Sequence, residues 1–489
     1  MGDLNWLSIK EANSGLKKKD FSSEDLVKAC LRQLEETDKK LNNFVTVTEE
    51  LALERARAVD KKIAQGEEIG VLEGVPAGIK DILNTREVRT TCSSKMLENF
   101  VPPYESTATA RLLENGYVLL GKTNLDEFAC GVSTERSAFG TSLNPWNTDC
   151  VAGGSSGGST SAVAAGQIFY SLGTDTGGSI RLPASFCGCV GLKVTYGRVS
   201  RFGVTSMASS WDTIGPIARS VEDAAIVLNA IAGHDPYDAT TPKIEVPDYT
   251  KNLSYDVKGL RIGIPDEYFS DGVDEEVKEK VMEAIKEFEK MGASLKKISL
   301  PLTKYGVAVY YVTMPGELST NLARFDGVRF GYKPEGEMSD LIDYYKKVRG
   351  EGFGDEIKRR IMVGTFVLSA GYADAYYKQA QRVRTLFIRE FQDAFKDVDV
   401  IMAPSAPSPA MKVGEKVNDP LAMYLLDVLT IPASTAGLPA ISIPCGFSSD
   451  GLPIGLQIIG PQWAETEVLK AASAYEQATD WNKMRPKLG

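Results

Sequence analysis

Apolar residues recur along the chain at two spacings, one typical of helices and one typical of strands. Within residues 21–40 they stand three or four positions apart, and Ser22 or Ser23 precedes them. This spacing predicts an amphipathic helix that begins behind a serine cap. The apolar positions of this helix are Leu26, Val27, Cys30, Leu31 and Leu34.

Similar patterns predict elements along the rest of the chain. The predicted helices cover 48–66, 106–116, 160–165, a segment opened by a capping box at Ser220–Asp223, 275–292 and most of 355–396. The predicted strands cover part of 72–83 with Lys80 near the end, 117–120, 168–172, 260–265, 397–403, and a hairpin of 440–447 with 453–460.

Helices and strands alternate through most of the chain, which is typical of an α/β layer fold. A polar, proline-bearing connector over 234–258 could divide two domains, but strands on both sides of it could equally join one sheet. We expect one large α/β unit over residues 1–489, with a helical insertion at roughly 304–395.

The composition limits which partners and which cellular compartment we expect for this chain. The formal net charge is −10, whereas an intrinsic nucleic-acid-binding surface needs a basic stripe. No window approaches about 18 uninterrupted apolar residues, so we expect no transmembrane span. The first residues, MGDLNWLSIK, lack the basic and apolar regions of a secretion signal, and we expect a cytoplasmic protein.

Cysteine and histidine limit the possible chemistry further. The seven cysteines are scattered, and only Cys187 and Cys189 stand close together, without a second pair or a histidine at zinc-site spacing. We therefore expect no metal. The only histidine, His234, lies in the turn-rich connector, so any mechanism that uses a histidine base depends on this one residue.

Residues 153–181 hold eight glycines and six serines around the apolar run 168–172. Glycine-rich loops bind phosphate before helices, but the P-loop pattern needs a lysine where Ser159 follows Gly158. The segment 154–158 also matches the nucleophile elbow G-x-S-x-G with Ser156 as nucleophile, which would require His234 as the base. Both interpretations compete with a third one that combines the two serine loops with Lys80.

Lys80 could replace a histidine base if burial lowers its pKa. Its flanking residues, 75–79 and 82–83, are apolar or small, although a surface lysine after a strand is the alternative. In the second loop, Ser179 directly follows Gly177 and Gly178, whose backbone N–H groups could form an oxyanion hole. A lysine, a relay serine and a nucleophilic serine would then form a complete proton path.

The segments GVPAGIKDI, GGSSGGSTSAVAAG and GTDTGGSIRLPASFCGCVGLK resemble the motifs of the amidase signature family. The resemblance implies a central mixed β-sheet covered by helices on both faces, and a Lys–Ser–Ser triad. It assigns Lys80 as the base, Ser155 as the relay serine and Ser179 as the acyl-forming nucleophile. The family spacing alone favours Ser155 over Ser156. Thr176, Gly177 and Gly178 would supply the N–H groups of the oxyanion hole together with Ser179.

Four further segments, including EGFGDEIKRRIMVGTFVLS and YLLDVLTIPAS, resemble one subfamily over nearly the whole chain: the A subunits of aspartyl/glutamyl-tRNA(Asn/Gln) amidotransferases. This resemblance implies that the chain hydrolyses glutamine and passes ammonia to the B subunit of a heterotrimer that also holds a C subunit. It also implies that this chain holds no cofactor, that ATP and Mg belong to the partner, and that charged tRNA is bound mainly there.

By position, Tyr310, Arg359 and Asp427 resemble the glutamine-recognising residues of the subfamily. Their chemistry suits a free amino acid, which needs a cation for its carboxylate and an anion for its ammonium. For Arg359, a solvated helix face is the alternative. For the whole chain, the alternatives are a stand-alone amidase that hydrolyses small carboxamides and a catalytically silent scaffold.

Overall fold

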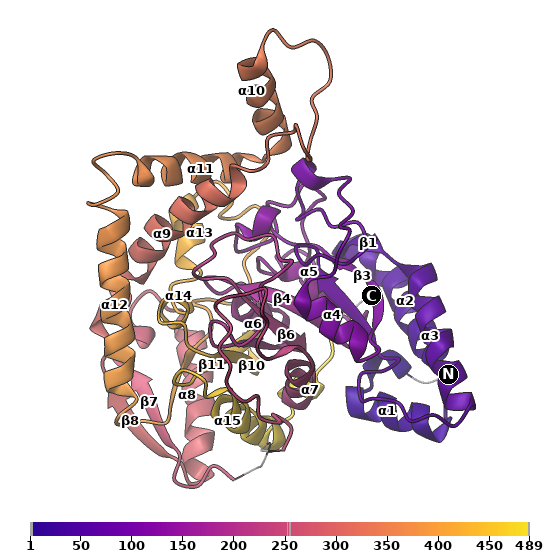
Figure 1. The fold of residues 1–489 in the computed structure, drawn as a ribbon. Helices are drawn as coiled ribbons and strands as arrows, with labels where there is room; N and C mark the ends of the chain where they lie inside the picture. Colours follow the sequence, from indigo (N-terminus) through magenta and orange to yellow (C-terminus); the bar gives the residue numbers. More distant parts are fainter. Residues whose placement is uncertain (1–2, 252, 254–255, 488–489) are drawn as a thin grey trace.

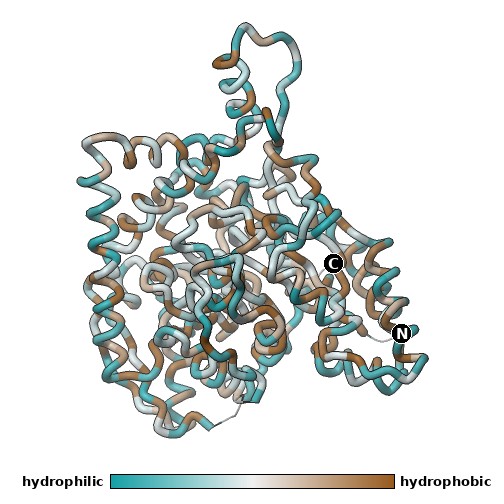
Figure 2. The backbone as a smooth tube through the Cα atoms, in the orientation of Figure 1, coloured by the Kyte–Doolittle hydropathy of each residue, from teal (hydrophilic) through white to brown (hydrophobic). Residues whose placement is uncertain are grey.

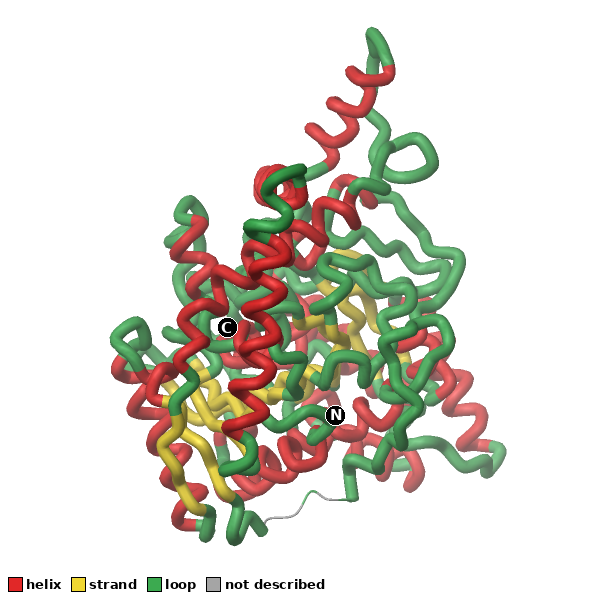
Figure 3. Tube along the Cα trace, turned by 60° about the vertical axis from the view of Figure 1, so that its left-hand side comes forward, coloured by secondary structure: helices red, strands yellow, loops and turns green. Residues whose placement is uncertain are grey.

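The computed structural model describes residues 3–251, 253 and 256–487, and one mixed sheet of eleven strands forms its centre (Figures 1 and 3). The order across the sheet is β1-β3-β2-β4-β6-β5-β10-β11-β9-β7-β8. The strands are β1 (Phe44–Val47), β2 (Pro76–Lys80), β3 (Val118–Thr123), β4 (Tyr170–Asp175), β5 (Val190–Lys193), β6 (Thr213–Ala218), β7 (Arg261–Pro265), β8 (Ser294–Ile298), β9 (Val400–Pro404), β10 (Ala440–Phe447) and β11 (Pro453–Ile459).

Helices flank this sheet, and short 3₁₀ turns connect several of the elements. The helices are α1 (Ile9–Lys18), α2 (Ser23–Leu41), α3 (Glu49–Ala64), α4 (Thr107–Glu114), α5 (Gly157–Ala164), α6 (Arg181–Cys187), α7 (Val221–Ile231), α8 (Glu275–Lys290), α9 (Gly306–Leu322), α10 (Leu341–Gly352), α11 (Asp355–Leu368), α12 (Tyr377–Ala394), α13 (Pro420–Leu425), α14 (Ile431–Thr435) and α15 (Glu465–Ala478). The 3₁₀ turns are η1 (Leu4–Trp6), η2 (Lys95–Leu97), η3 (Glu127–Ala129), η4 (Asp266–Phe269), η5 (Pro301–Tyr305) and η6 (Trp481–Lys483). None of these helices is both long enough and apolar enough to cross a membrane.

The sheet combines parallel and antiparallel neighbours. β2 runs parallel to β3 and β4, and β7 runs parallel to β8 and β9, while the remaining pairs are antiparallel. The predicted α/β fold is therefore confirmed. Strands from before and after the 234–258 connector share this sheet, as expected if one unit spans the connector. Residues 252 and 254–255 of that connector lie outside the described residues.

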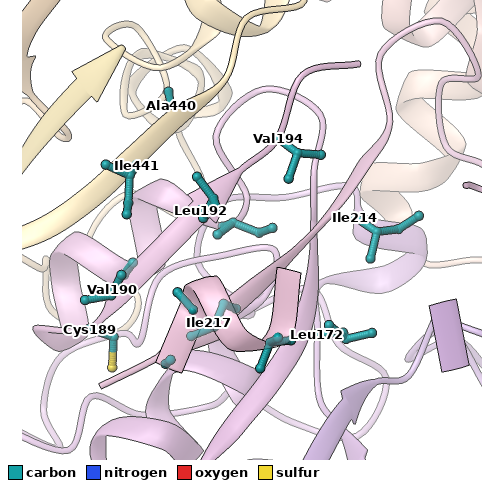
Figure 4. Close-up of a cluster of buried hydrophobic side chains, with 14 of the residues drawn as sticks. Leu172, Cys189, Val190, Leu192, Val194, Ile214, Ile217, Ala440 and Ile441 are labelled. Carbon is teal, nitrogen blue, oxygen red and sulfur yellow. The ribbon is translucent and has the colours of Figure 1, made fainter. Parts of the chain in front are cut away.

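Apolar side chains of β4, β5, β6 and β10 pack together at the middle of the sheet. Figure 4 shows this cluster, and all of its labelled residues are buried: Leu172, Cys189, Val190, Leu192, Val194, Ile214, Ile217, Ala440 and Ile441. In Figure 2 hydrophilic stretches follow outer helices and loops, among them α12 and the loop next to α10. The centre of the sheet is thus a dry, rigid support for the loops at its strand ends.

Several predicted elements agree with the structure because their signals are local. α2 begins behind Ser22, whose hydroxyl accepts from the N–H of Asp25, while the Asp25 carboxylate accepts from the N–H of Ser22. The predicted hairpin is also present as β10 and β11, with Ala440 paired to Ile459.

Two predictions need correction. The strand predicted over 168–172 is β4, which begins at Tyr170 and continues to Asp175 because it pairs with β6 over its full length. At α7, Ser220 caps the helix, but the reciprocal half of the predicted capping box is absent among the described contacts. The carboxylate of Asp223 instead accepts from the N–H of Ile9 at 2.9 Å, so a distant segment takes the place of the local partner.

A helical segment fills the chain between β8 and β9 and forms one side of the molecule (Figure 1). Within it, α11 approaches α9 so closely that a Cβ added at Gly364 would lie 1.8 Å from the carbonyl oxygen of Pro315. Only a glycine permits this contact, which fixes α11 directly against α9.

Candidate active site

Lys80 ends β2, an inner strand of the sheet, and its side chain is fully buried. Its Nζ lies 2.8 Å from each of three hydroxyl oxygens, those of Ser155, Ser156 and Thr174. Burial lowers the pKa of Lys80 to about 7, although nearby carboxylates oppose the shift. A large fraction of the amine is therefore uncharged near neutral pH and available to accept a proton.

Ser155 and Ser179 come from the two loops that surround β4. Ser155 follows a cis peptide bond after Gly154 and precedes α5, while Ser179 lies between β4 and α6. The N–H of Ser156 donates to the carbonyl of Ser179 at 3.1 Å. This backbone bond joins the loop of Ser179 to the loop whose serines contact Lys80.

Ser155 and Ser156 are equally close to the amine, but their other contacts differ. The Ser156 hydroxyl donates to the carbonyl of Thr174 at 3.2 Å and accepts from the Thr174 N–H at 3.4 Å. Within the described residues, the Ser155 hydroxyl has only the contact with Lys80. Its proton is thus not committed to the backbone, which gives a structural reason for Ser155 as the relay.

The loop 176–179 carries the backbone N–H groups predicted for the oxyanion hole. Within the described part of the chain, the N–H groups of Thr176, Gly177, Gly178 and Ser179 donate no hydrogen bond. Backbone N–H groups that converge in a buried site can stabilise a developing oxyanion. A Cβ at Gly177 would lie 2.9 Å from Cζ of Tyr310, so this loop is also in close contact with α9.

Asp427 approaches the same loop from the segment before α14. A Cβ added at Gly178 would lie 2.7 Å from Oδ1 of Asp427. That oxygen is buried and has no hydrogen-bond partner among the described residues. Burial raises the pKa of Asp427 to about 8, and the charges of Arg181 and Arg360 oppose the shift. Tyr310 and Asp427 therefore lie together at the predicted oxyanion loop.

Arg359 lies on the exposed side of α11, whereas its neighbour Arg360 is buried. The Arg359 side chain is 44% exposed and pairs with Glu356. Arg360 is buried, with its guanidinium 4.7 Å from the ring of Tyr311 and 4.6 Å from that of Tyr424. Its charge acts on both Tyr310 and Asp427. Of the two arginines, Arg360 is thus the buried cation, while Arg359 as a glutamine-recognising residue stays a prediction.

Other polar residues of the site carry weak or no sequence signals. Asp126, in the turn after β3, donates its N–H to the carbonyl of Ser155 at 3.3 Å, and its carboxylate accepts from the N–H of Thr134 at 2.9 Å. Thr174 lies within β4 and reads as an ordinary strand residue. Asp126 lies in GKTNLDEFACGVSTERSAFG, one of the four segments that carry the subfamily resemblance. This resemblance was the one sequence signal for Asp126.

The histidine-based interpretation finds no support in the contacts of His234. Its Nδ1 lies 2.9 Å from the carbonyl of Thr241 in the same connector. The hydroxyl of Ser156, the serine of the G-x-S-x-G match, instead bonds Lys80. All seven cysteines are buried free thiols.

Replacing each serine beside Lys80 separately tests the relay assignment. We expect Ser155→Ala to lower kcat for amide hydrolysis by about 100-fold or more, since positioned proton transfer contributes about 100- to 10,000-fold. Ser156→Ala should cost about tenfold or less, because it removes a hydroxyl already bonded to the backbone. Steady-state kinetics of both variants at matched thermal stability would show this order, and the opposite order would assign the relay to Ser156.

Comparison with known proteins places this site in a family. The family model described as Amidase matches residues 25–469. The chain is 54% identical over 479 residues to the A subunit of the glutamyl-tRNA(Gln) amidotransferase of Geobacter metallireducens, with 98% of each sequence covered. The crystal structure of the A subunit of the glutamyl-tRNA(Gln) amidotransferase from Thermotoga maritima superposes with a TM-score of 0.83 at 40% identity, covering 100% of this chain and 99% of that one.

A bacterial aryl acylamidase structure is also similar, with a TM-score of 0.85 at 26% identity, covering 99% of this chain and 98% of that one. The family match includes Lys80, both serine loops and the helical segment that carries Tyr310 and Arg360. The chain therefore belongs to the amidase family.

Proposed function

We propose that this chain is the glutamine-hydrolysing A subunit of a tRNA-dependent amidotransferase. The single observation that carries the proposal is the unpartnered Asp427 oxygen beside the predicted oxyanion loop, with a buried cation nearby. Simple carboxamides carry no charge that these groups would bind. The curated relatives named for this activity cover almost the whole chain, which also favours it over a stand-alone amidase.

The reaction uses the proton path from Ser179 to Lys80. The Ser179 hydroxyl attacks the side-chain amide carbon of glutamine, and its proton passes through the Ser155 hydroxyl to the neutral Lys80 amine. The N–H groups of residues 176–179 hold the negative oxygen of the tetrahedral intermediate. The proton then returns through Ser155 to the amide nitrogen, the C–N bond breaks and ammonia leaves. Water attacks the resulting ester by the same path and releases glutamate.

The charged groups around the loop match the ends of a free amino acid. The ammonium of glutamine would bind the Asp427 carboxylate, and this ion pair would bring the pKa of Asp427 back down. The carboxylate of glutamine would bind Arg360, whose Nε donates to Glu356 at 2.7 Å and whose terminal nitrogens have no hydrogen bond recorded among the described residues. Tyr310, packed against Gly177, would close the pocket over the amide.

The remaining steps would occur in the partners of this chain. Ammonia would pass to the B subunit of a heterotrimer completed by the C subunit, and ATP and Mg would activate the mischarged tRNA there. The net charge of −10 agrees with tRNA contact mainly through the partner. This chain itself would then use no cofactor.

A serine variant separates glutamine hydrolysis from the later steps. In the complex with the B and C subunits, Ser179→Ala should abolish glutaminase activity and glutamine-dependent amidation of charged tRNA. Ammonium chloride should restore amidation in the same variant, because exogenous ammonia replaces the missing product. Assays of released glutamate and of amidated aminoacyl-tRNA test this. Unchanged glutaminase activity in Ser179→Ala would contradict the mechanism, and efficient hydrolysis of aryl or aliphatic amides by the isolated chain would favour a stand-alone amidase.

The two adjacent arginines provide a matched pair for substrate recognition. We expect Arg360→Gln to raise KM for glutamine by roughly 10- to 100-fold, since it removes a buried charge partner of the substrate carboxylate. Arg359→Gln removes an exposed charge from the same turn of α11 and should leave KM within about twofold. Glutaminase kinetics of the complex measure both values. A larger effect for Arg359→Gln would return the assignment to Arg359.

A further inference from the structure

Thr176 links the oxyanion loop to a carboxylate that the mechanism above does not use. Its hydroxyl donates to Oδ1 of Asp212 at 2.8 Å. Asp212 is buried and directly precedes β6, which pairs with β4 up to Asp175, the residue before Thr176. The contact therefore joins the first residue of the oxyanion loop to the neighbouring strand.

The other oxygen of Asp212 holds a second loop. Its Oδ2 accepts from the N–H groups of Met207 and Ala208, both at 3.0 Å, and from the hydroxyl of Ser206 at 3.1 Å. One carboxylate thus receives donors from two segments. An amide could accept from Thr176, but its nitrogen would face the two N–H donors, so a carboxylate suits this position better.

The loop that Asp212 holds is also attached to the helical segment. Trp211 meets Tyr310 edge-on with ring centroids 5.4 Å apart, and the N–H of Ser210 donates to Glu317 of α9 at 2.9 Å. The guanidinium of Arg384 in α12 lies 4.3 Å from the ring of Trp211. Asp212 therefore connects two parts of the site. It bonds Thr176 of the oxyanion loop, and it holds the loop whose Trp211 packs against Tyr310.

The charge of Asp212 also raises the pKa of Lys80, the base of the proposed mechanism. Its negative charge favours the charged form of Lys80, as do the charges of Asp126 and Asp175, against the desolvation that dominates. A cavity of about 190 Å³ is lined by both Asp212 and Thr174, the strand residue whose hydroxyl contacts Lys80. Burial raises the pKa of Asp212 to about 6, and the charge of Arg201, which lines the same cavity, opposes this shift.

We propose that Asp212 is a positioning residue of the reaction: through the Thr176 hydroxyl it fixes the direction of the oxyanion N–H groups. It touches neither the substrate nor the reacting atoms. The inference rests on the proposed function, which names glutamine as the substrate. An oxyanion hole would, however, stabilise the tetrahedral intermediate of any amide. A displacement of about 1 Å in such a group can cost about 100-fold in rate, so a remote hydrogen bond is sufficient to affect catalysis.

A double-mutant cycle in the complex with the partner subunits tests the proposal. Thr176→Val keeps the shape of the side chain and removes its hydroxyl, and Asp212→Asn removes the charge and one acceptor. We expect each to lower kcat for glutamine by about 10- to 100-fold with KM within about twofold, and the double variant to be no slower than the slower single one. Thr176→Ser should retain most of the activity, because it keeps the hydroxyl.

The pH profile separates positioning from a merely structural role. Asp212→Asn should move the acid limb of kcat/KM to lower pH, since it removes one of the charges that hold up the pKa of Lys80. Thr176→Val should leave that limb in place. Asp223→Asn is the matched control: Asp223 is likewise buried and accepts from a backbone N–H of another segment, and it should change neither kcat nor the profile.

The proposal is overturned if Thr176→Val and Asp212→Asn both keep kcat within about twofold of the parent, or if their losses multiply in the double variant. If Asp212→Asn fails to fold, the comparison of Thr176→Val with Thr176→Ser decides the question. Should the parent complex hydrolyse no glutamine, the proposed function fails. The same variants assayed on a simple carboxamide then decide the role of Asp212 independently.

Discussion

The site depends on the amine of Lys80, which is buried away from water at the end of β2, an inner strand of the sheet. β3 and β4 pair with the two edges of β2, so Lys80 lies in the interior of the protein. There its amine contacts three hydroxyls in place of water. Desolvation disfavours the ammonium more strongly than the surrounding carboxylates favour it. A lysine that stayed charged there could only donate to the serines, and neither serine could be activated.

The remaining parts of the site are arranged around this base by contacts between distant segments. The two serine loops are joined by a backbone hydrogen bond, and the glycines of the second loop allow Tyr310 and Asp427 to approach its backbone. Gly364 lets α11 contact α9 directly, which brings Arg360 to the side of the site where Tyr310 lies. One rigid sheet thus supports the base and the nucleophile, while the helical segment supplies the groups suited to the substrate.

The sequence predicted the features whose causes are local. The serine cap predicted at Ser22 or Ser23, the amphipathic pattern of α2 and the turn between β10 and β11 each depend on residues only a few positions apart, so a local pattern was sufficient for each. The Gly-rich spacing and the apolar flanks of Lys80 indicated a buried base beside serines, and the family resemblance selected which serines.

The features that sequence reasoning missed are decided by tertiary contacts. Asp223 bonds the backbone of Ile9, 214 positions away, so no local pattern could reveal its partner. Arg359 and Arg360 are adjacent and chemically identical, and only the packing of α11 against aromatic rings of α9 and α13 determines which one is buried. The role that we propose for Asp212 likewise depends on its contact with Thr176, a residue 36 positions away in the sequence.

The most direct test of the account is the titration of Lys80 itself, by NMR of the protein labelled with ¹³C at the lysine ε-carbons. The signal absent from Lys80→Met identifies Lys80, and the signals absent from Lys122→Met and Lys193→Met identify the two other buried lysines. Burial lowers the pKa of both, that of Lys193 to about 7. The account predicts that Lys80 titrates near pH 7. A titration together with the surface lysines, at about pH 10, would contradict it.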